Sequence, residues 1–251
     1  MPARALSISP AARAQLGIFL FAYLLYSAAR FVTIGDLGVA QANAGWIMDL
    51  EDTLGLAVEQ SVQQSLTGTW ALWVLNHLYL IAQLGVLPGA LIFLYKRSLP
   101  MYERLRNTIL ATWVLSIPIY AAFPVAPPRL ANSGLIDTIS AQTGVALDSS
   151  LTTSFYNELA AVPSLHVGFA IAIGLAVAAA VRNPVVKVAA WLWGPAIALA
   201  VVATGNHYMF DIAAGVVAAG LGYILGAAVA LAVRTRSTAP ARVLRPSFAE
   251  A

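Results

Sequence analysis

The sequence contains no cysteine, which excludes a disulfide framework, a thiolate metal site and a redox-active thiol. Charged residues are also scarce, at 10% of the 251 residues, compared with about 25% in an ordinary soluble domain. Only three histidines are present, and neither a His-Glu-x-x-His pattern nor a glycine-rich nucleotide loop occurs. The sequence thus gives little support to metal or nucleotide chemistry, and we expect no metal and no cofactor.

Long apolar runs are what the chain does have. Hydrophobic residues make up 60% of it, and about 20 consecutive apolar residues cross a bilayer as a helix. We therefore predict an all-α polytopic membrane protein, a six-transmembrane-helix bundle with an interfacial helix and an external loop over the active site. The expected spans are 16–34, 70–95, 105–123, 162–181, 188–203 and 208–233.

The distribution of charge predicts the orientation. Lysines and arginines precede the first span, separate the second from the third and the fourth from the fifth, and follow the sixth, whereas the opposite loops carry most of the acids. By the positive-inside rule, both termini are cytoplasmic and the acidic loops are extracytoplasmic, in our interpretation at a bacterial plasma membrane. The formal charge of +3 follows from this topology and indicates no nucleic-acid partner.

The two ends of the chain allow further expectations. We assign 1–234 to a single membrane domain, and 235–251, rich in Ser, Pro, Arg and Ala, to a disordered cytoplasmic tail. A cleaved signal that ends near Ser27-Ala28-Ala29 is the alternative to a first span. Either interpretation leaves the loop that follows on the external side.

Two external segments stand out. Apolar residues recur near helical spacing over 45–66, which predicts a helix at the outer membrane interface with its acids and glutamines facing water, or alternatively a partner-binding helix. In the second segment, 124–161, three prolines within five residues end the third span and fix an extended path before Arg129. The length and apolar content of this segment favour a lid or active-site loop.

Two histidines fall at the outer ends of expected spans, His166 in "PSLHVG" and His207 in "TGNHYMFD". Both of these helices start on the external side, so the topology alone brings the two imidazoles to one face. Asp211 follows His207 by four residues and would share its helix face, accept a hydrogen bond from one ring nitrogen and leave the other for a substrate. A helix-end pair that only satisfies buried polar groups is the alternative.

These helix ends favour a phosphate ligand, because helix amino ends bind phosphate. With Pro163 at the first helical position, we expect the backbone N–H groups of Ser164 and Leu165 to point into the pocket. The guanidinium of Arg129 would clamp two phosphate oxygens, or alternatively anchor its loop at the headgroup level.

The second span carries further polar side chains near its external start, namely Asn76, His77 and Tyr79. Together with Asn206, they are possible substrate contacts. For His77 the alternative is a histidine that is hydrogen-bonded within its own helix.

The set "PSLH" followed further along by "HYMFD" resembles the type 2 phosphatidic acid phosphatase superfamily. Within it, "FPVAPPRL", "PSLHVGFA" and "TGNHYMFD" are similar to the inositolphosphotransferase branch, which includes fungal inositol phosphorylceramide synthase. The resemblance covers about 76–214 of the chain. It implies that His207 is the nucleophile and forms a phosphohistidine, that Asp211 orients it and that His166 is the general acid.

The chain departs from the lipid phosphatase branch at two places. An upstream Lys and Arg-Pro motif is not found, and a Ser-Arg pair is replaced by Ala200 and Val201. By analogy within the family, loss of that arginine favours transfer over hydrolysis and makes Arg129 the candidate phosphate clamp.

The resemblance implies a metal-independent lipid phosphatase or phosphotransferase at the extracytoplasmic face. Its substrate would be a phospholipid or polyprenyl phosphate in the bilayer, and it would transfer a phospho-head group such as inositol phosphate to an acceptor alcohol. A simple lipid phosphate or pyrophosphate phosphatase is one alternative. A non-enzymatic lipid-binding or transport protein is the other, although the sequence shows no internal repeat of the kind transporters often have.

Overall fold

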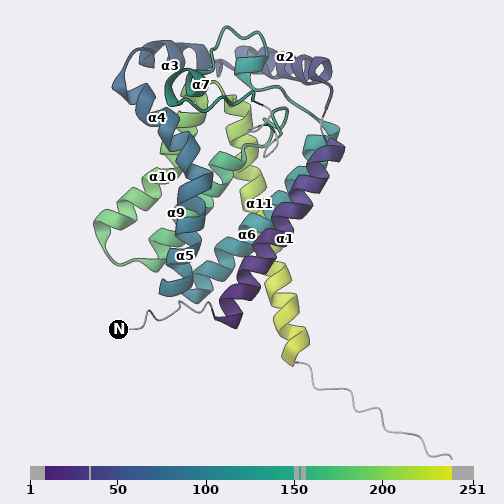
Figure 1. Ribbon diagram of the computed structural model, residues 1–251, viewed down its shortest axis with the longest axis vertical. Helices are drawn as coiled ribbons and strands as arrows, with labels where there is room; N and C mark the ends of the chain where they lie inside the picture. Colours follow the sequence, from purple (N-terminus) through teal and green to yellow (C-terminus); the bar gives the residue numbers. More distant parts are fainter. Residues whose placement is uncertain (1–8, 34, 150–152, 154–156, 239–251) are drawn as a thin grey trace, which may run out of the picture.

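The computed structural model describes residues 9–33, 35–149, 153 and 157–238, and it is built of helices joined by loops (Figure 1). They are α1 (Pro10–Thr33), α2 (Leu37–Leu54), α3 (Glu59–Leu66), α4 (Trp70–Ile81), the π-helix η1 (Ala82–Val86), α5 (Leu87–Arg97), α6 (Leu99–Ala122), the 3-10 helix η2 (Pro128–Leu130), α7 (Thr138–Thr143), α9 (Leu165–Ala180), α10 (Pro184–Ala203) and α11 (Met209–Thr238). Within the described ranges, one isolated bridge between Val125 and Ala160 is the only β pairing. The predicted all-α class is confirmed.

Among the residues that the structure describes, four stretches are long and apolar enough to cross a membrane, namely Pro10–Ala29, Trp70–Arg97, Pro184–Ala203 and Met209–Thr235. The second contains α4, η1 and α5. Two other predicted spans fall short: α9 has only 16 residues, and polar residues such as Arg106 and Asn107 lower the hydropathy of α6. The chain is therefore an integral membrane protein by its apolar helices, and the count of six spans stays a prediction.

The bundle is centred on α9, which packs against α10, α11, α6 and α5. Glycine allows two of these contacts. A methyl group on Gly174 would meet the carbonyl oxygen of Ala190 on α10, and one on Gly215 of α11 would meet the carbonyl oxygen of Ser164, just before α9. Small residues let membrane helices approach closely, and here they bring the start of α9 against the first turns of α11.

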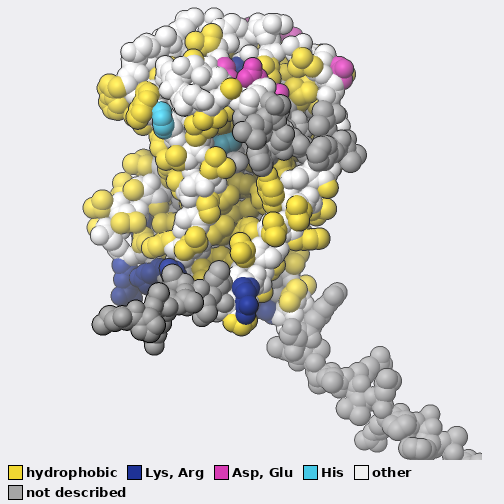
Figure 2. All heavy atoms as spheres, in the orientation of Figure 1, with side chains coloured by type: hydrophobic (Ala, Val, Ile, Leu, Met, Phe, Trp, Pro, Cys, Tyr) yellow, Lys and Arg dark blue, Asp and Glu magenta, His cyan; other side chains and the backbone are white. Residues whose placement is uncertain are grey.

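One end of the bundle is covered by α2, α3 and α7, whereas α1 begins and α11 ends at the opposite end (Figure 1). Acidic side chains gather near the covered end, and lysine and arginine side chains gather at the other (Figure 2). This separation agrees with the charge pattern from which the orientation was predicted. α11 continues past Arg234 to Thr238, within the segment assigned to the tail, and the rest of that segment lies outside the described residues.

The segment 45–66 forms parts of two helices, where the sequence predicted one. α2 ends because Gly55 takes a left-handed backbone conformation (φ 69°) that caps the helix carbonyls. The prediction that its acids and glutamines face water is wrong for Glu51, Glu59 and Gln63, which are all buried. They face inward because they satisfy backbone groups at the ends of α10 and α11.

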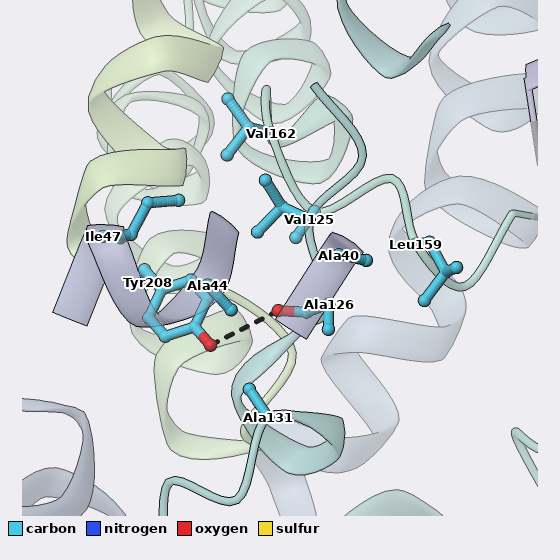
Figure 3. Close-up of a cluster of buried hydrophobic side chains, with 10 residues drawn as sticks. Ala40, Ala44, Ile47, Val125, Ala126, Ala131, Leu159, Val162 and Tyr208 are labelled. Carbon is cyan, nitrogen blue, oxygen red and sulfur yellow. Dashed lines mark hydrogen bonds between the residues drawn. The ribbon is translucent and has the colours of Figure 1, made fainter. Parts of the chain in front are cut away.

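The proline-rich segment packs onto α2. Val125 and Ala126 are fully buried in a cluster with Ala40 and other small side chains of α2 (Figure 3). The N–H of Ala126 donates to the carbonyl oxygen of Ala40 at 3.1 Å, and the hydroxyl of Tyr208 donates to the carbonyl oxygen of Ala126 at 3.3 Å. These contacts fix the path of the segment between α2 and the start of α11, and thereby position Arg129.

Candidate active site

His207 and Asp211 form a buried pair at the covered end of the bundle. Nδ1 of His207 lies 3.1 Å from Oδ2 of Asp211, and the same oxygen accepts the backbone N–H of Tyr208 at 2.9 Å. Asp211 has no exposed surface. A carboxylate in this position places the ring proton on Nδ1, which leaves the lone pair of Nε2 for chemistry. The predicted pairing is confirmed.

The backbone geometry that brings His207 and Asp211 together differs from the prediction. α10 ends at Ala203, Gly205 takes a left-handed conformation (φ 69°), and α11 begins only at Met209, so His207 lies in the turn before the helix. The N–H of His207 donates to the carbonyl oxygen of Val201 at 3.2 Å. The aspartate thus reaches back from the first turn of α11, as an acid near a helix start commonly does, and the two residues do not share a helical face.

Ser164 caps α9, which begins at Leu165, so Pro163 precedes the cap and does not occupy the predicted first helical position. The hydroxyl oxygen of Ser164 accepts the N–H of Val167 at 3.5 Å, and its own N–H donates to the backbone oxygen of Asp211 at 3.1 Å. Ser164 therefore joins α9 to α11, and its N–H is not available to a phosphate. Leu165 borders the cavity described next, and within the described ranges no protein group accepts its N–H.

A cavity of about 80 Å³ lies between the two histidines. The ring centroids of His166 and His207 are 6.2 Å apart, and His166 stacks on Tyr79 with centroids 4.1 Å apart. All three side chains border the cavity. A cavity of about 10–15 Å³ already holds one water molecule, so this space has room for a small group such as phosphate. The predicted convergence of the two histidines is confirmed.

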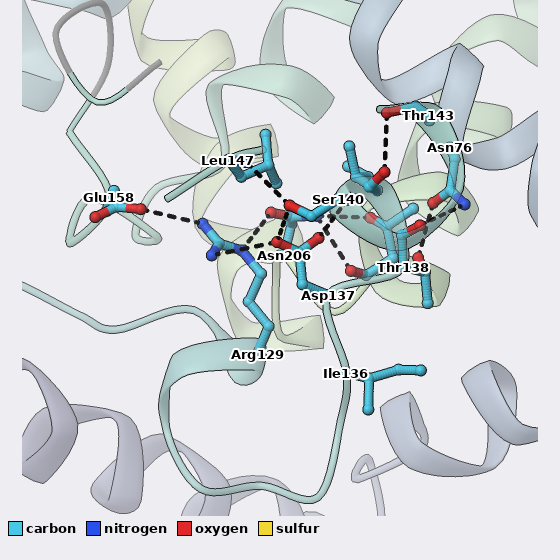
Figure 4. Close-up of polar contacts among 12 residues, drawn as sticks. Asn76, Arg129, Ile136, Asp137, Thr138, Ser140, Thr143, Leu147, Glu158 and Asn206 are labelled. Atoms are coloured by element: carbon cyan, nitrogen blue, oxygen red, sulfur yellow. Dashed lines mark hydrogen bonds and ion pairs between the residues drawn. The ribbon is translucent and has the colours of Figure 1, made fainter. Parts of the chain in front are cut away.

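Arg129 brings a guanidinium to the same cavity, with 2% of its side chain exposed. Its Nε donates to Oδ1 of Asn206 at 3.1 Å, and its two terminal nitrogens each lie 3.9 Å from a carboxylate oxygen, of Asp137 and of Glu158 (Figure 4). Asn206 in turn donates to the hydroxyl of Thr204 at 2.9 Å. These contacts hold the cation in one place beside the histidines.

Of the three polar residues predicted on the second span, Tyr79 borders the cavity and the other two do not. The side chain of Asn76 is buried against α7, where it accepts the hydroxyl of Thr138 at 2.7 Å (Figure 4). Nδ1 of His77 lies 2.7 Å from the carbonyl oxygen of Trp73, and the two rings are tilted by 37° with centroids 4.0 Å apart. His77 therefore has the contacts of the alternative interpretation, a histidine bonded within its own helix.

Two carboxyl groups that the sequence analysis placed in water instead cap α11. Oε1 of Glu51 accepts the N–H of Phe210 at 2.6 Å, and Oε1 of Glu59 accepts the N–H of Met209 at 2.8 Å. The first N–H groups of a helix have no acceptor within that helix, and these two acids supply one. The capped turn carries Asp211, so α2 and α3 position the carboxylate that orients His207.

Gln63 caps the C-terminal end of α10. Its side-chain amide donates to the carbonyl oxygen of Ala203 at 3.2 Å and to that of Ile136 at 3.0 Å, so α3 contacts both helix ends that border the site. The four-residue spacing of Glu59 and Gln63 puts both on one face of a helix, and this was the available signal in the sequence. Their partners lie far along the chain, which local spacing does not indicate.

The free energy of unfolding depends on pH through the carboxyl group of Glu51. Burial raises the pKa of its carboxyl from 4.5 to about 8, the hydrogen bond from Phe210 opposes the rise, and the adjacent Glu59 carboxyl adds to it. The folded chain therefore holds this proton more tightly than the unfolded chain does. The resulting stabilisation is complete below about pH 4.5 and is lost as the pH rises through about 8.

We expect the melting temperature in detergent to fall across this window and the fall to be smaller in Glu51→Gln. Glutamine keeps an oxygen for Phe210 and an N–H for Glu59, but it does not titrate. The measurement is thermal unfolding as a function of pH, with Asp49→Asn, an exposed acid of the same helix, as the control that keeps the wild-type slope. An unchanged slope in Glu51→Gln would contradict the role given to Glu51.

Apolar helices of membrane-spanning length and a buried histidine–carboxylate pair beside a second histidine place the chain in the class of integral membrane proteins with a histidine-based candidate site. A family model described as the PAP2 superfamily matches residues 45–225, from α2 into α11. The chain belongs to the PAP2 superfamily, as the resemblance of its motifs predicted, and membership suggests a lipid phosphatase-type function. No curated protein and no solved structure matches the chain.

Proposed function

We propose that this protein is a metal-independent lipid phosphatase or phosphotransferase that acts on a phospholipid or polyprenyl phosphate through a phosphohistidine at His207. The observation that carries the proposal is the His207–Asp211 pair, which faces His166 across a cavity the size of a phosphate group. The suggested function of the superfamily supports it.

In the first step, Nε2 of His207 attacks phosphorus, forming a P–N bond as the P–O bond to the leaving group breaks. His166, protonated at the start, gives its proton to the departing oxygen. Asp211 keeps the other proton on Nδ1 of His207 and stabilises the positive charge that develops on the ring. The guanidinium of Arg129 and the N–H of Leu165 bind the phosphate oxygens.

In the second step, an acceptor oxygen attacks the phosphohistidine. His166, now neutral, takes the proton of the acceptor, the new P–O bond forms and the P–N bond breaks, which restores both histidines. Water as acceptor releases the phosphate group, whereas an alcohol gives a new phosphoester. The same residues serve both reactions.

We favour transfer of a head group such as inositol phosphate to an acceptor alcohol, as in the inositolphosphotransferase branch. Val201 occupies the place of an arginine in the phosphatase branch and is fully buried, and Arg129 supplies a cation beside the cavity instead. Hydrolysis is the second candidate, and the phosphatase-type function suggested by the superfamily favours it.

We also propose that the site faces the outside of a bacterial plasma membrane, with both termini in the cytoplasm. The separation of acidic and basic side chains between the two ends of the bundle supports this orientation (Figure 2). The chain has no cysteine, so a single introduced cysteine can report on it. An impermeant thiol reagent should label Asp49→Cys and spare Lys96→Cys in intact cells, and the reverse pattern would overturn the orientation.

The function is tested with purified protein and labelled phosphatidic acid, phosphatidylinositol and polyprenyl phosphate, each with and without an acceptor alcohol. A new phosphoester supports transfer, and phosphate release that ignores the alcohol supports hydrolysis. Rapid quenching should trap an acid-labile phosphoprotein with the label on His207. Absence of both product and phosphoprotein across the panel would overturn the enzymatic proposal in favour of lipid binding or transport.

A further inference from the structure

A second, much larger cavity lies beside the candidate site, between α1, α5 and α6. Its volume is about 690 Å³, compared with about 80 Å³ for the cavity at the histidines. Apolar side chains form most of its wall, among them Leu16, Phe19, Leu91, Ile92 and Trp113. Binding pockets for whole ligands typically measure about 300–1,000 Å³, so this cavity accommodates a much larger apolar group than the phosphate-sized one.

The two cavities adjoin. Gln83 borders both of them. On the facing side, Tyr26 of α1 borders the small cavity and stacks on Trp113, whose ring borders the large one, with centroids 5.8 Å apart. Tyr23, one turn earlier on α1, also borders the large cavity. The elements α1, η1 and α6 therefore contribute side chains to the walls of both cavities.

Gln83 lies in η1, the π-helical turn of five residues between α4 and α5. A π-helical turn holds one residue more than an α-helical turn and shifts the faces of the helix on either side of it, and such turns are frequent at functional sites. Here the shift occurs where the wall changes from the small polar cavity, which Tyr79 borders, to the apolar one, which Leu87 borders. Gln83 is thus the polar side chain at the junction.

The far end of the large cavity lies near Gln15 and Lys96. From Gln83 to Lys96 the helix extends about 20 Å, at about 1.5 Å per residue. Half of a bilayer's hydrocarbon core is about 15 Å thick. A ligand that fills both spaces therefore has a small anionic head and a hydrocarbon chain at least as long as one leaflet.

We infer that the cavity between α1, α5 and α6 binds the hydrocarbon chain of the lipid substrate, with Gln83 beside the point where chain and phosphate meet. This inference rests on the proposed function, because the head group in the small cavity is what places the chain. A docked protein helix fits less well, since the small cavity at the inner end would stay unfilled. The cavity thereby selects substrates by the length of their chain.

Ile92 offers the sharpest variant, because it borders the cavity and is 58% exposed, so a larger side chain there need not disturb the core. Leu175→Trp is the matched control. Leu175 is 46% exposed and borders a different apolar cavity of about 460 Å³, between α6, α9 and α11, which shares no bordering residue with the histidine site.

The experiment compares two lipid phosphates with the same head group, one with short chains that are soluble as monomers and one with long chains. We expect Ile92→Trp to lower kcat/KM for the long-chain substrate relative to the short-chain one by about tenfold, mainly through KM. Leu175→Trp should leave this ratio at the wild-type value. An unchanged ratio in Ile92→Trp, or an equal change in the control, would overturn the inference.

A measurement without turnover separates this inference from the proposed function. A long-chain lipid phosphate with a photoactivatable group at the chain end should label peptides of α1 and α5, and unlabelled lipid phosphate should compete. Labelling of α9 and α11, or labelling without competition, would overturn the chain site even in an active enzyme. Specific labelling of α1 and α5 in a protein that turns over no substrate would retain the chain site and reject only the catalytic proposal.

Discussion

His207→Ala is expected to lower the turnover of a lipid phosphate by about 10⁴-fold or more, since removal of a nucleophile eliminates the covalent route. The phosphoprotein should disappear in the same variant. His77→Ala is the matched control, because His77 contacts Trp73 and does not border the cavity. Its activity should stay within about twofold of the wild type, because a change away from the site usually alters stability by no more than about 0.5 kcal/mol. Both variants are compared by initial rates on the same detergent-solubilised lipid.

The choice of leaving group distinguishes the role of His166 from that of His207. The leaving group of a nitrophenyl phosphoester, nitrophenolate, departs without a proton. This substrate should therefore restore much of the first step in His166→Ala and none of it in His207→Ala. His166→Ala should also accumulate phosphoprotein, because the acceptor then lacks its base. If the two variants respond alike to the activated ester, the roles given to His166 and His207 are wrong.

The apolar runs and the charge pattern were sufficient to predict the class of fold and the meeting of the two histidines. Hydropathy is a local property, and alternation of basic and acidic loops assigns each helix end to a side. His166 and His207 each stand at a helix end on the same side, so the prediction needed no tertiary contact. The structure brings their ring centroids to within 6.2 Å.

The His207–Asp211 pair was predicted correctly for the wrong reason. A spacing of four residues fits a shared helix face, but the left-handed Gly205 and the turn after it delay the start of α11 until Met209. A hydrogen bond to an acid in the first turn of a helix is also compatible with this spacing. The sequence pattern therefore predicted the pair without distinguishing the two geometries.

The residues that the sequence analysis misplaced have partners far away in the chain. The sequence pattern predicted Glu51 and Glu59 on the water-facing side of an amphipathic helix, but in the structure they accept the N–H groups of Phe210 and Met209. Asn76 was predicted as a possible substrate contact, but its side chain accepts a hydrogen bond from Thr138 of α7. A polar side chain in an apolar protein needs a partner, and its local sequence does not distinguish a ligand from a distant backbone group.

Arg129→Ala is expected to lower kcat/KM by about 10²- to 10³-fold, the usual cost of losing a positioned donor to a developing phosphate charge. The side chain borders the cavity and is 2% exposed. Arg129→Lys keeps the charge but loses the planar fork and the Nε bond to Asn206, so it should fall between Ala and the wild type. Kinetics on long-chain and short-chain lipid phosphates measure the loss, which should be equal for both because the cation contacts the head group.

The stability of the Arg129→Ala variant distinguishes the two roles considered for Arg129, a phosphate clamp and an anchor for its loop. Arg129 lies 3.9 Å from the carboxylates of Asp137 and Glu158, and its removal leaves the buried Asn206 without its Nε donor, so it should cost about 1–3 kcal/mol of unfolding free energy. Arg234→Ala breaks an exposed pair with Glu103 and should cost less than about 1 kcal/mol. If added guanidinium restores turnover in Arg129→Ala without raising its melting temperature, the cation acts on phosphate. Recovery of activity only under conditions that restore stability would make it a loop anchor, and the missing arginine at Val201 would then have no replacement in this site.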